Sequence, residues 1–274
     1  IYPLSFSEYY NARQGDINNA WKEYYTFGGL PQTLLLKENK EKIDYLCHLA
    51  DTVYINDVIE RHRVKNRAEL EELLRIIASS IGSSCNPTKL SNTFKSLKNI
   101  TISNKTINNY LNHLSDAFMI ERAIRYNIKG KKYINTMSKY YFTDIGLRNA
   151  LLDFRQTEQT HIMENIIYNE LLYRGYSVDV GVVETTGHDK NGKFIRKQFE
   201  VDFVVNDADK RYYIQSAFSI PDEEKMIQET ASFRNIDDSF KKIIIVKDDI
   251  MSYTDENGFL HIGLFDFLLK QEAL

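Results

Sequence analysis

Cysteine and long apolar runs are both scarce in this chain of 274 residues. The two cysteines, Cys47 and Cys85, lack metal-ligand spacing, which predicts buried thiols in a reducing compartment. The six histidines are scattered, and no pair has the helical spacing of zinc ligands. No apolar run approaches the roughly 20 residues that span a bilayer. Because no signal peptide is visible either, we expect a cytoplasmic protein without membrane contact.

A P-loop is also missing. Gly28 and Gly29 could cradle a phosphate, but no Lys-Ser or Lys-Thr pair follows them. The sequence G-x-x-x-x-G-K-[ST] occurs nowhere in the chain, which excludes ATP binding in the P-loop manner. The favoured interpretation of the glycines is a helix stop, followed by a helix that starts at Pro31.

The composition is that of an ordinary globular protein, with 43% apolar and 27% charged residues. The length is sufficient for two or three domains. The net charge of −3 conceals a segregation of charge along the chain. Residues 61–148 hold 16 Lys and Arg against 6 Asp and Glu, which leaves 19 basic and 32 acidic residues elsewhere. A basic block of this kind is typical of a module that binds a polyanion.

The basic block is centred on residues 87–141, whose pattern predicts a winged helix-turn-helix. Leu90, Phe94 and Leu97 fall at helical spacing, and a second helix is expected over residues 103–114 with Ser103 as its N-cap. Two strand-like runs, 118–126 and 139–142, then flank a lysine-rich turn. Helix, turn, helix and a two-stranded wing is the order of this motif.

The second helix offers short polar and basic side chains on the face opposite its apolar stripe. Lys105, Asn108 and Asn109 are the types expected against base edges in a major groove, and Lys129, Lys131 and Lys132 suit a wing on phosphate. The alternative is a helical hairpin with a solvated polar face that docks a protein or serves as scaffold. We favour DNA contact.

The remaining elements indicate a multidomain α+β protein. Helices are expected over 41–60, 67–82, 143–152, 161–173, 221–234 and 264–270; strands are expected over 177–183, 199–205, 211–218, 241–246 and 259–262. Residues 187–192 resemble a hairpin loop. We therefore expect a helical region over 1–65, a winged helix over 66–153 and a C-terminal α/β domain over 154–274.

The C-terminal domain places carboxylates in a familiar order. Glu164 lies on a helix, Asp202 on a strand, and Gln215-Ser216-Ala217 on the next strand. Nucleases of the PD-(D/E)XK type have Glu-x-Lys at this last position, where the acids hold Mg²⁺ and the lysine supports the attacking water. Gln215 is a poor Mg²⁺ ligand and Ala217 cannot replace a lysine, so we expect a nuclease-like fold without competent catalysis.

Two nearby acids keep an alternative open. Glu184 and Glu200 could substitute at a metal site, and Glu200 shares a sheet face with Asp202 because the two residues lie two apart on one strand. A metal site with such a substitution would use Glu164, Asp202 and Glu200. Ordinary exposed carboxylates are an equal interpretation of Glu184 and Glu200.

Short sequence motifs, which occur in the same order along the whole chain, resemble the C-terminal part of a broad family of prokaryotic AAA-type ATPases. The motifs are Pro3-Leu-Ser-Phe-Ser-Glu8, Gly28-Gly-Leu-Pro31, Tyr54-Ile-Asn-Asp57, Tyr141-Phe-Thr-Asp-Ile-Gly-Leu147, Met163-Glu-Asn165, Glu170-Leu171, Glu200-Val-Asp-Phe203 and Tyr213-Ile-Gln215. The resemblance implies a helical lid-like region, a winged helix and a nuclease-like domain, preceded in the whole protein by an ATPase domain. The start at Ile1 rather than Met agrees with a chain from which that domain was removed.

From these patterns we expect a tail that binds DNA and senses partners, without catalysis of its own. The implied ATPase domain would bring ATP and Mg²⁺, whereas no cofactor is expected within this chain. DNA, the ATPase domain itself and a further protein are the expected partners. The alternatives are a metal-dependent nuclease with a modified site and a protein-docking scaffold.

Overall fold

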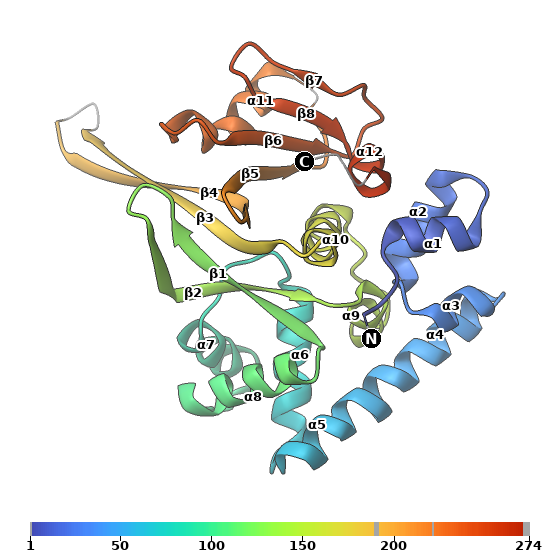
Figure 1. The fold of residues 1–274 in the computed structure, drawn as a ribbon. Coiled ribbons are helices and arrows are strands. Elements are labelled where there is room, and N and C mark those ends of the chain that lie inside the picture. The colour runs from blue at the N-terminus through green and yellow to red at the C-terminus, as the bar shows by residue number, and fades with distance from the viewer. Residues whose placement is uncertain (1, 189–191, 221, 271–274) are drawn as a thin grey trace. The chain divides into compact units, whose positions relative to one another are not determined.

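A computed structural model describes residues 2–188, 192–220 and 222–270, apart from the side chains of Leu97 and Glu223. The chain divides into two compact units. Unit 1 comprises residues 1–122 and 138–169, and unit 2 comprises residues 123–137 and 170–274. The boundaries between the units fall inside three regular elements, β1, β2 and α10, which Figure 1 labels.

The fold is mixed, with helices and one eight-stranded sheet. The helices are α1 (Phe6–Arg13), α2 (Ile17–Phe27), α3 (Pro31–Leu35), α4 (Asn39–His48), η1 (Leu49–Tyr54), α5 (Ile55–His62), α6 (Arg67–Ser79), α7 (Pro87–Lys98), α8 (Asn104–Asp116), α9 (Ile145–Leu151), α10 (Gln159–Tyr173), α11 (Glu223–Thr230), η2 (Phe233–Asn235) and α12 (Leu264–Leu269). The strands are β1 (Ile120–Asn127), β2 (Lys132–Phe142), β3 (Ser177–His188), β4 (Phe194–Asp207), β5 (Lys210–Ala217), β6 (Lys241–Val246), β7 (Tyr253–Thr254) and β8 (Leu260–Gly263).

The glycine pair near the N-terminus ends one helix before the next begins. Gly28 is the C-cap of α2 and has a φ of 74°, in the region that favours glycine. Pro31 is the first residue of α3, where its missing N–H leaves no helix bond unmade. The predicted helix stop and proline-started helix are confirmed.

The predicted helix over 41–60 corresponds to three consecutive helical segments. An α-helix, α4, passes into the π-helical turn η1 and then into the α-helix α5 without leaving helical geometry. The following helix, α6, is shorter than the predicted 67–82 and ends at Ser79. Leu70, Leu73, Leu74 and Ile77 are buried and define the face that this helix packs inward.

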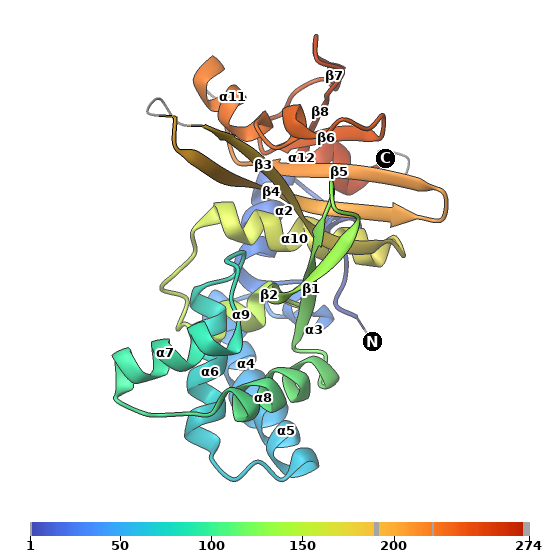
Figure 2. The same ribbon diagram turned by 90° about the vertical axis from the view of Figure 1, so that its left-hand side faces the viewer.

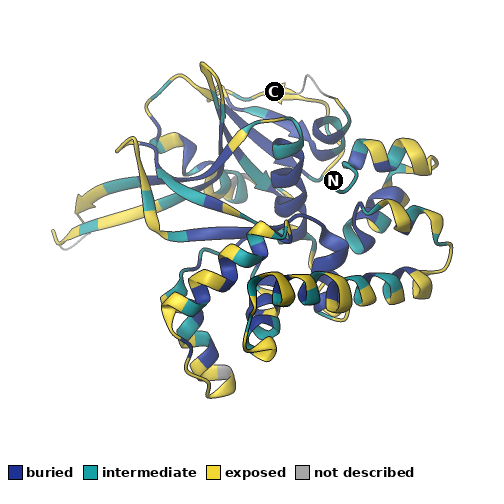
Figure 3. Ribbon diagram, turned by 60° about the horizontal axis from the view of Figure 1, so that its bottom comes forward, coloured by how far each residue is buried: buried dark blue, intermediate teal, exposed yellow. Residues whose placement is uncertain are grey.

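The order expected over residues 87–142 is present as α7, α8, β1 and β2. Both views place α6, α7 and α8 close together within unit 1 (Figures 1 and 2). Helix α9 follows, and it is buried along its whole length (Figure 3). Its polar residues form hydrogen bonds with other helices of unit 1. Arg148 Nε donates to the carbonyl of Ala78 at 2.8 Å, and Asn149 Nδ2 donates to the carbonyls of Tyr25 and Thr26.

Unit 2 is organised by the sheet, whose strand order is β2-β1-β3-β4-β5-β6-β8-β7. Parallel pairs occur at β1–β3, β5–β6 and β6–β8, and antiparallel pairs at β3–β4, β4–β5 and β7–β8. Residues 125–127 of β1 pair with 180–182 of β3. The strands predicted as a wing therefore join the same sheet as the α/β strands.

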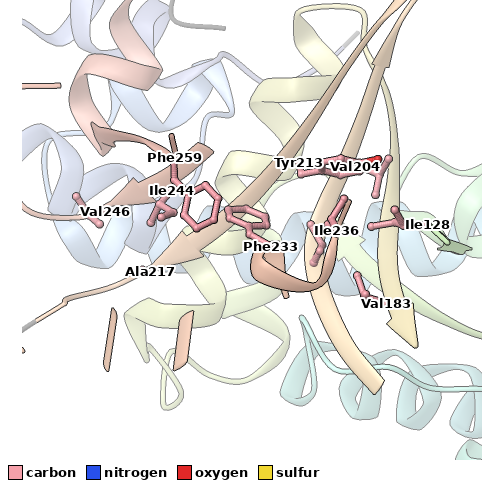
Figure 4. Packing of buried hydrophobic residues seen from close by; sticks show 11 residues of the cluster. Ile128, Val183, Val204, Tyr213, Ala217, Phe233, Ile236, Ile244, Val246 and Phe259 are labelled. Atoms are coloured by element: carbon pink, nitrogen blue, oxygen red, sulfur yellow. The ribbon is translucent and has the colours of Figure 1, made fainter. Parts of the chain in front are cut away.

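The core of unit 2 lies where β3, β4, β5 and β6 are covered by the segment around η2 (Figure 4). Its buried members are Ile128, Val183, Val201, Val204, Tyr213, Ala217, Phe233, Ile236, Ile244, Val246 and Phe259. Strand β6 has the predicted bounds and is buried from its second residue on. The predicted helix start at Pro221 and the centre of the predicted 187–192 loop, residues 189–191, lie outside the described residues.

Among the described residues, no helix combines the length and the apolar character needed to cross a bilayer.

Candidate nucleic-acid interface

Helices α7 and α8 of unit 1 begin at side-chain caps that the sequence supplies. Asn86 accepts a hydrogen bond from the Lys89 amide at 2.7 Å and starts α7. Ser103 accepts from the Thr106 amide at 3.1 Å and starts α8, which confirms the predicted N-cap. These oxygens satisfy amides that the first helical turn leaves without a backbone partner.

The apolar side of each helix is buried within unit 1. On α8, Ile107, Tyr110, Leu111 and Leu114 are at most 7% exposed, as the predicted apolar face requires. On α7, Leu90 and Phe94 are buried, whereas the Leu97 side chain lies outside what the structure describes. Burial of the α8 stripe fixes its rotation about the helix axis, so the opposite side faces outward.

That opposite side carries the three residues predicted to meet base edges. Lys105, Asn108 and Asn109 are all exposed on α8. The start of the helix is tied to α7, because Asn104 Nδ2 donates to Thr88 Oγ1 at 3.0 Å. The structure thus brings these three predicted residues together on one helix face, on a supported element rather than a loop.

The two helices carry only positive charges along most of their length, and Asp116 at the end of α8 is their acidic residue. Residues 87–112 contain four lysines, Lys89, Lys95, Lys98 and Lys105, and no aspartate or glutamate. Lys98 Nζ lies 3.4 Å from a carboxylate oxygen of Glu72 on α6, an exposed pair that contributes little to stability. Lys89 Nζ donates to the carbonyl of Ser84 at 3.0 Å, and all four lysines are exposed.

The lysine-rich turn between β1 and β2 belongs to unit 2, unlike α8. Lys129, Lys131 and Lys132 are all exposed. Asn127 Oδ1 accepts from the Gly130 amide at 2.7 Å and holds the turn, and Lys129 Nζ lies 3.7 Å from Asp237. The six residues predicted to contact DNA are therefore three from each unit.

Glu164, the first predicted nuclease position, is engaged inside unit 1. Lys139 Nζ and Tyr141 Oη donate to its Oε1 at 2.8 and 2.6 Å, and His161 Nδ1 lies 3.6 Å from Oε2. Burial by itself raises the pKa of Glu164, but the Lys139 ammonium and the neighbouring donors outweigh it and lower the pKa to about 2. The carboxylate is thus a buried, charged partner of a lysine.

The other predicted nuclease positions lie in unit 2. Asp202 on β4 is buried, and its Oδ2 accepts from the Ser216 amide at 2.8 Å. Gln215 on β5 is half-buried, and its Oε1 has no hydrogen-bond partner among the described residues. Ala217, two residues further on, packs in the apolar core of unit 2.

Phe203 and Ile214 are paired in the antiparallel β4–β5 ladder. Asp202 directly precedes Phe203 and Gln215 directly follows Ile214, so the structure brings both residues to the same end of this ladder. The two acids considered as substitutes differ in setting. Glu184 is held by Arg196 and Gln198 of the β3–β4 hairpin, and the Arg196 hydrogen bond lowers its pKa. Glu200 is half-buried on β4.

One group of residues was missed from the sequence. His62 on α5 and His113 on α8 stack their rings, with centroids 3.8 Å apart, and Asp116 lies three residues after His113. Histidine spacing predicted no transition-metal site, because these two histidines are far apart in the sequence. The His113 and Asp116 spacing was the one local signal.

Comparison with known proteins places the chain in a family. Residues 18–158, just over half of the chain, match the family model described as a domain of unknown function (DUF8612), and the chain belongs to this family. The matched region begins in α2 and ends just before α10, so it includes α7, α8 and the β1–β2 hairpin.

Two curated relatives match nearly the whole chain. An uncharacterized protein of Haemophilus influenzae is 35% identical over 276 residues, covering 98% of this chain and 64% of the relative. An uncharacterized protein of Methanocaldococcus jannaschii, MJ1544, is 28% identical over 278 residues, covering 97% of this chain and 59% of the relative. The chain thus spans about three-fifths of the length of these relatives.

Among solved structures, protein VC1899 from Vibrio cholerae aligns with 87% of this chain and 56% of its own, at a TM-score of 0.30 and 11% identity.

Proposed function

We propose that this chain is a DNA-binding tail in which α7, α8 and the β1–β2 hairpin act as a winged helix-turn-helix. The observation that carries the proposal is the exposed face of α8, where Lys105, Asn108 and Asn109 stand opposite a fully buried apolar stripe. Asparagine and lysine are side chains that reach base edges and phosphates when a helix enters the major groove.

The charge distribution supports the same proposal. Residues 87–112, which cover α7 and most of α8, contain lysines and no acidic residue, so they attract the phosphate backbone. Docking of an acidic protein is the competing use of this face. The two differ in how strongly affinity depends on salt and on the length of the nucleic acid.

The resemblance to the tails of prokaryotic AAA-type ATPases supports a wider proposal. The relatives have more than a third of their length outside the match, which is room for a P-loop domain. In that arrangement ATP and Mg²⁺ bind the ATPase domain, and this chain supplies a winged helix and a PD-(D/E)XK-like domain that bind DNA and partners without catalysis.

The test is fluorescence anisotropy of a labelled duplex against the chain across a salt series without divalent metal. We expect log affinity to fall linearly with log salt, with a steep slope. Lys105→Ala removes one positive charge from the interface and reduces that slope by about 1. Lys40→Ala, at an exposed position on α4, leaves it unchanged.

Two further variants separate the units. Lys131→Ala/Lys132→Ala reports on the hairpin turn of unit 2, and Asn108→Ala/Asn109→Ala on the base-reading face of α8. If the asparagine variant binds duplexes of different sequence with equal affinity while the wild-type chain does not, the result supports base reading in the groove. Absence of any anisotropy change at low salt contradicts the DNA proposal and assigns α8 to protein docking.

A second candidate function is metal-dependent cleavage at Asp202. It is favoured by the unpartnered Gln215 Oε1 at the same end of the β4–β5 ladder as Asp202, because a carbonyl oxygen can ligate Mg²⁺. Mg²⁺- or Mn²⁺-dependent loss of supercoiled plasmid that Asp202→Ala abolishes would establish it. We expect the plasmid to stay supercoiled, because Ala217 stands where these nucleases have a lysine.

A further inference from the structure

Three potential metal ligands of unit 1 converge from two helices. His62 is the last residue of α5, and His113 and Asp116 lie in the last turn of α8. Side chains three residues apart on a helix share one face, so His113 and Asp116 point to the same side of α8. One ligand atom from each of the three residues lies within 4.8 Å of the others.

The surroundings of the His62 ring suit coordination. His62 Nε2 is buried and has no hydrogen-bond partner among the described residues. A buried polar atom without a partner is uncommon and is explained when a ligand completes it.

We propose that His62, His113 and Asp116 form a binding site for a divalent transition-metal ion, of which Zn²⁺ is the representative. Two imidazoles with one carboxylate are a donor set that Zn²⁺ and its neighbours accept. Mg²⁺ and Ca²⁺ require mostly oxygen donors, so the site discriminates against them. Three protein ligands leave a fourth position for water or an external donor.

Binding reorients the two rings. The imidazole planes are stacked at an angle of 19°, so the lone pairs of the two rings lie in nearly parallel planes. Coordination of one ion by both nitrogens requires the lone pairs to converge, which rotation about the Cβ–Cγ bonds provides. The ion then links the end of α5 to the end of α8. This site does not depend on the proposal that α8 binds DNA.

The test is titration of the tag-free, metal-stripped chain with Zn²⁺ by calorimetry, and with Co²⁺ by visible absorption. One ion per chain is expected. His62→Gln, His113→Gln and Asp116→Asn should each lower the affinity for Zn²⁺ by at least about 10-fold. Removing a residue that only hydrogen-bonds a metal ligand already costs about that much, and these three substitutions remove a ligand itself. His48→Gln and Asp44→Asn, at exposed positions of α4, retain the wild-type affinity.

Two additional readouts separate binding from folding. The imidazole proton resonances of His62 and His113 shift on addition of Zn²⁺, whereas that of His48 does not. The thermal midpoint of wild-type chain rises with Zn²⁺, and that of His113→Gln does not. If His113→Gln fails to fold, Asp116→Asn at an exposed position provides the same comparison.

Stoichiometric binding that these three substitutions weaken supports the site. The proposal is overturned if the wild-type chain binds no ion under conditions where its fold is intact. It is also overturned if binding of unchanged affinity persists in both histidine variants, since the ion would then occupy other residues.

Discussion

Lys139 and Glu164 form a buried ion pair whose nitrogen and oxygen atoms are 2.8 Å apart, with side chains 3% and 9% exposed. The pair links β2 to α10 within unit 1, and Tyr141 donates to the same carboxylate oxygen. A buried pair of this kind is destabilising when one partner is removed, because the other is left charged without compensation.

We expect Glu164→Gln and Lys139→Met each to lower the free energy of unfolding by about 3–5 kcal/mol. The double variant should lose less than the sum of the two, since it leaves neither charge buried alone. Urea denaturation of the four proteins gives the double-mutant cycle. Strictly additive losses would show that the two groups do not interact.

The same carboxylate predicts a pH dependence at acid pH. The folded pKa of Glu164, about 2, is below its unfolded value of about 4.3. The stability that Glu164 contributes is therefore present above pH 4.3 and is lost as the pH falls toward 2. The difference in unfolding free energy between wild type and Glu164→Gln should narrow over this range, and a constant difference would contradict the shift.

Asp144 predicts the opposite dependence. It is buried at the N-cap of α9 and accepts from the Leu147 amide at 3.0 Å and from the Gly29 amide at 2.8 Å. Burial raises its pKa to about 6, although these donors oppose the shift. The stability that Asp144 contributes is fully present below its unfolded pKa, near 3.9, and is lost as the pH rises through 6. The total loss in the free energy of unfolding is roughly 3 kcal/mol at most.

The measurement is the difference in unfolding free energy between wild type and Asp144→Asn from pH 4 to 7. The asparagine does not titrate, so we expect the wild type to lose stability relative to it as the pH rises. A difference that is flat with pH would show that Asp144 has an ordinary pKa. Exposed Asp44→Asn serves as the control.

A glycine in the core of unit 2 predicts a packing effect. A Cβ atom at Gly181 on β3 would lie 2.8 Å from Val201 Cβ and 2.9 Å from Ile128 Cδ1, closer than carbon atoms approach. Gly181→Ala should cost about 1–3 kcal/mol through overpacking. Gly187→Ala, on the same strand with open space around it, should change stability by less than about 0.5 kcal/mol.

Local elements were predictable because their signals are local. Ser103 and the apolar stripe that follows it specify α8, and the β-branched run of β6 specifies a buried strand. The full length of β4 was not predictable, because residues 194–198 pair with β3 through main-chain bonds and are largely exposed. Main-chain pairing of that kind imposes no apolar alternation on the sequence.

Non-local relationships could not be predicted from these signals. The parallel pairing of 125–127 with 180–182 joins segments whose patterns reveal that they are strands but not which strands they pair with. The partners of Glu164 and the contact of His62 with His113 are of the same kind. Residue type indicated a functional carboxylate at Glu164, whereas the lysine that neutralises it became evident in three dimensions.

The division of the chain inside β1, β2 and α10 has a practical consequence for dissecting the molecule. Unit 1 is discontinuous in sequence, so no continuous segment of the chain comprises it alone. A fragment ending at residue 153 would omit Asn165 and Asn169, whose side chains bond the backbone of Phe142. Deleting residues 123–137 and rejoining their flanks, with a stop after residue 169, is the arrangement that would preserve unit 1 intact.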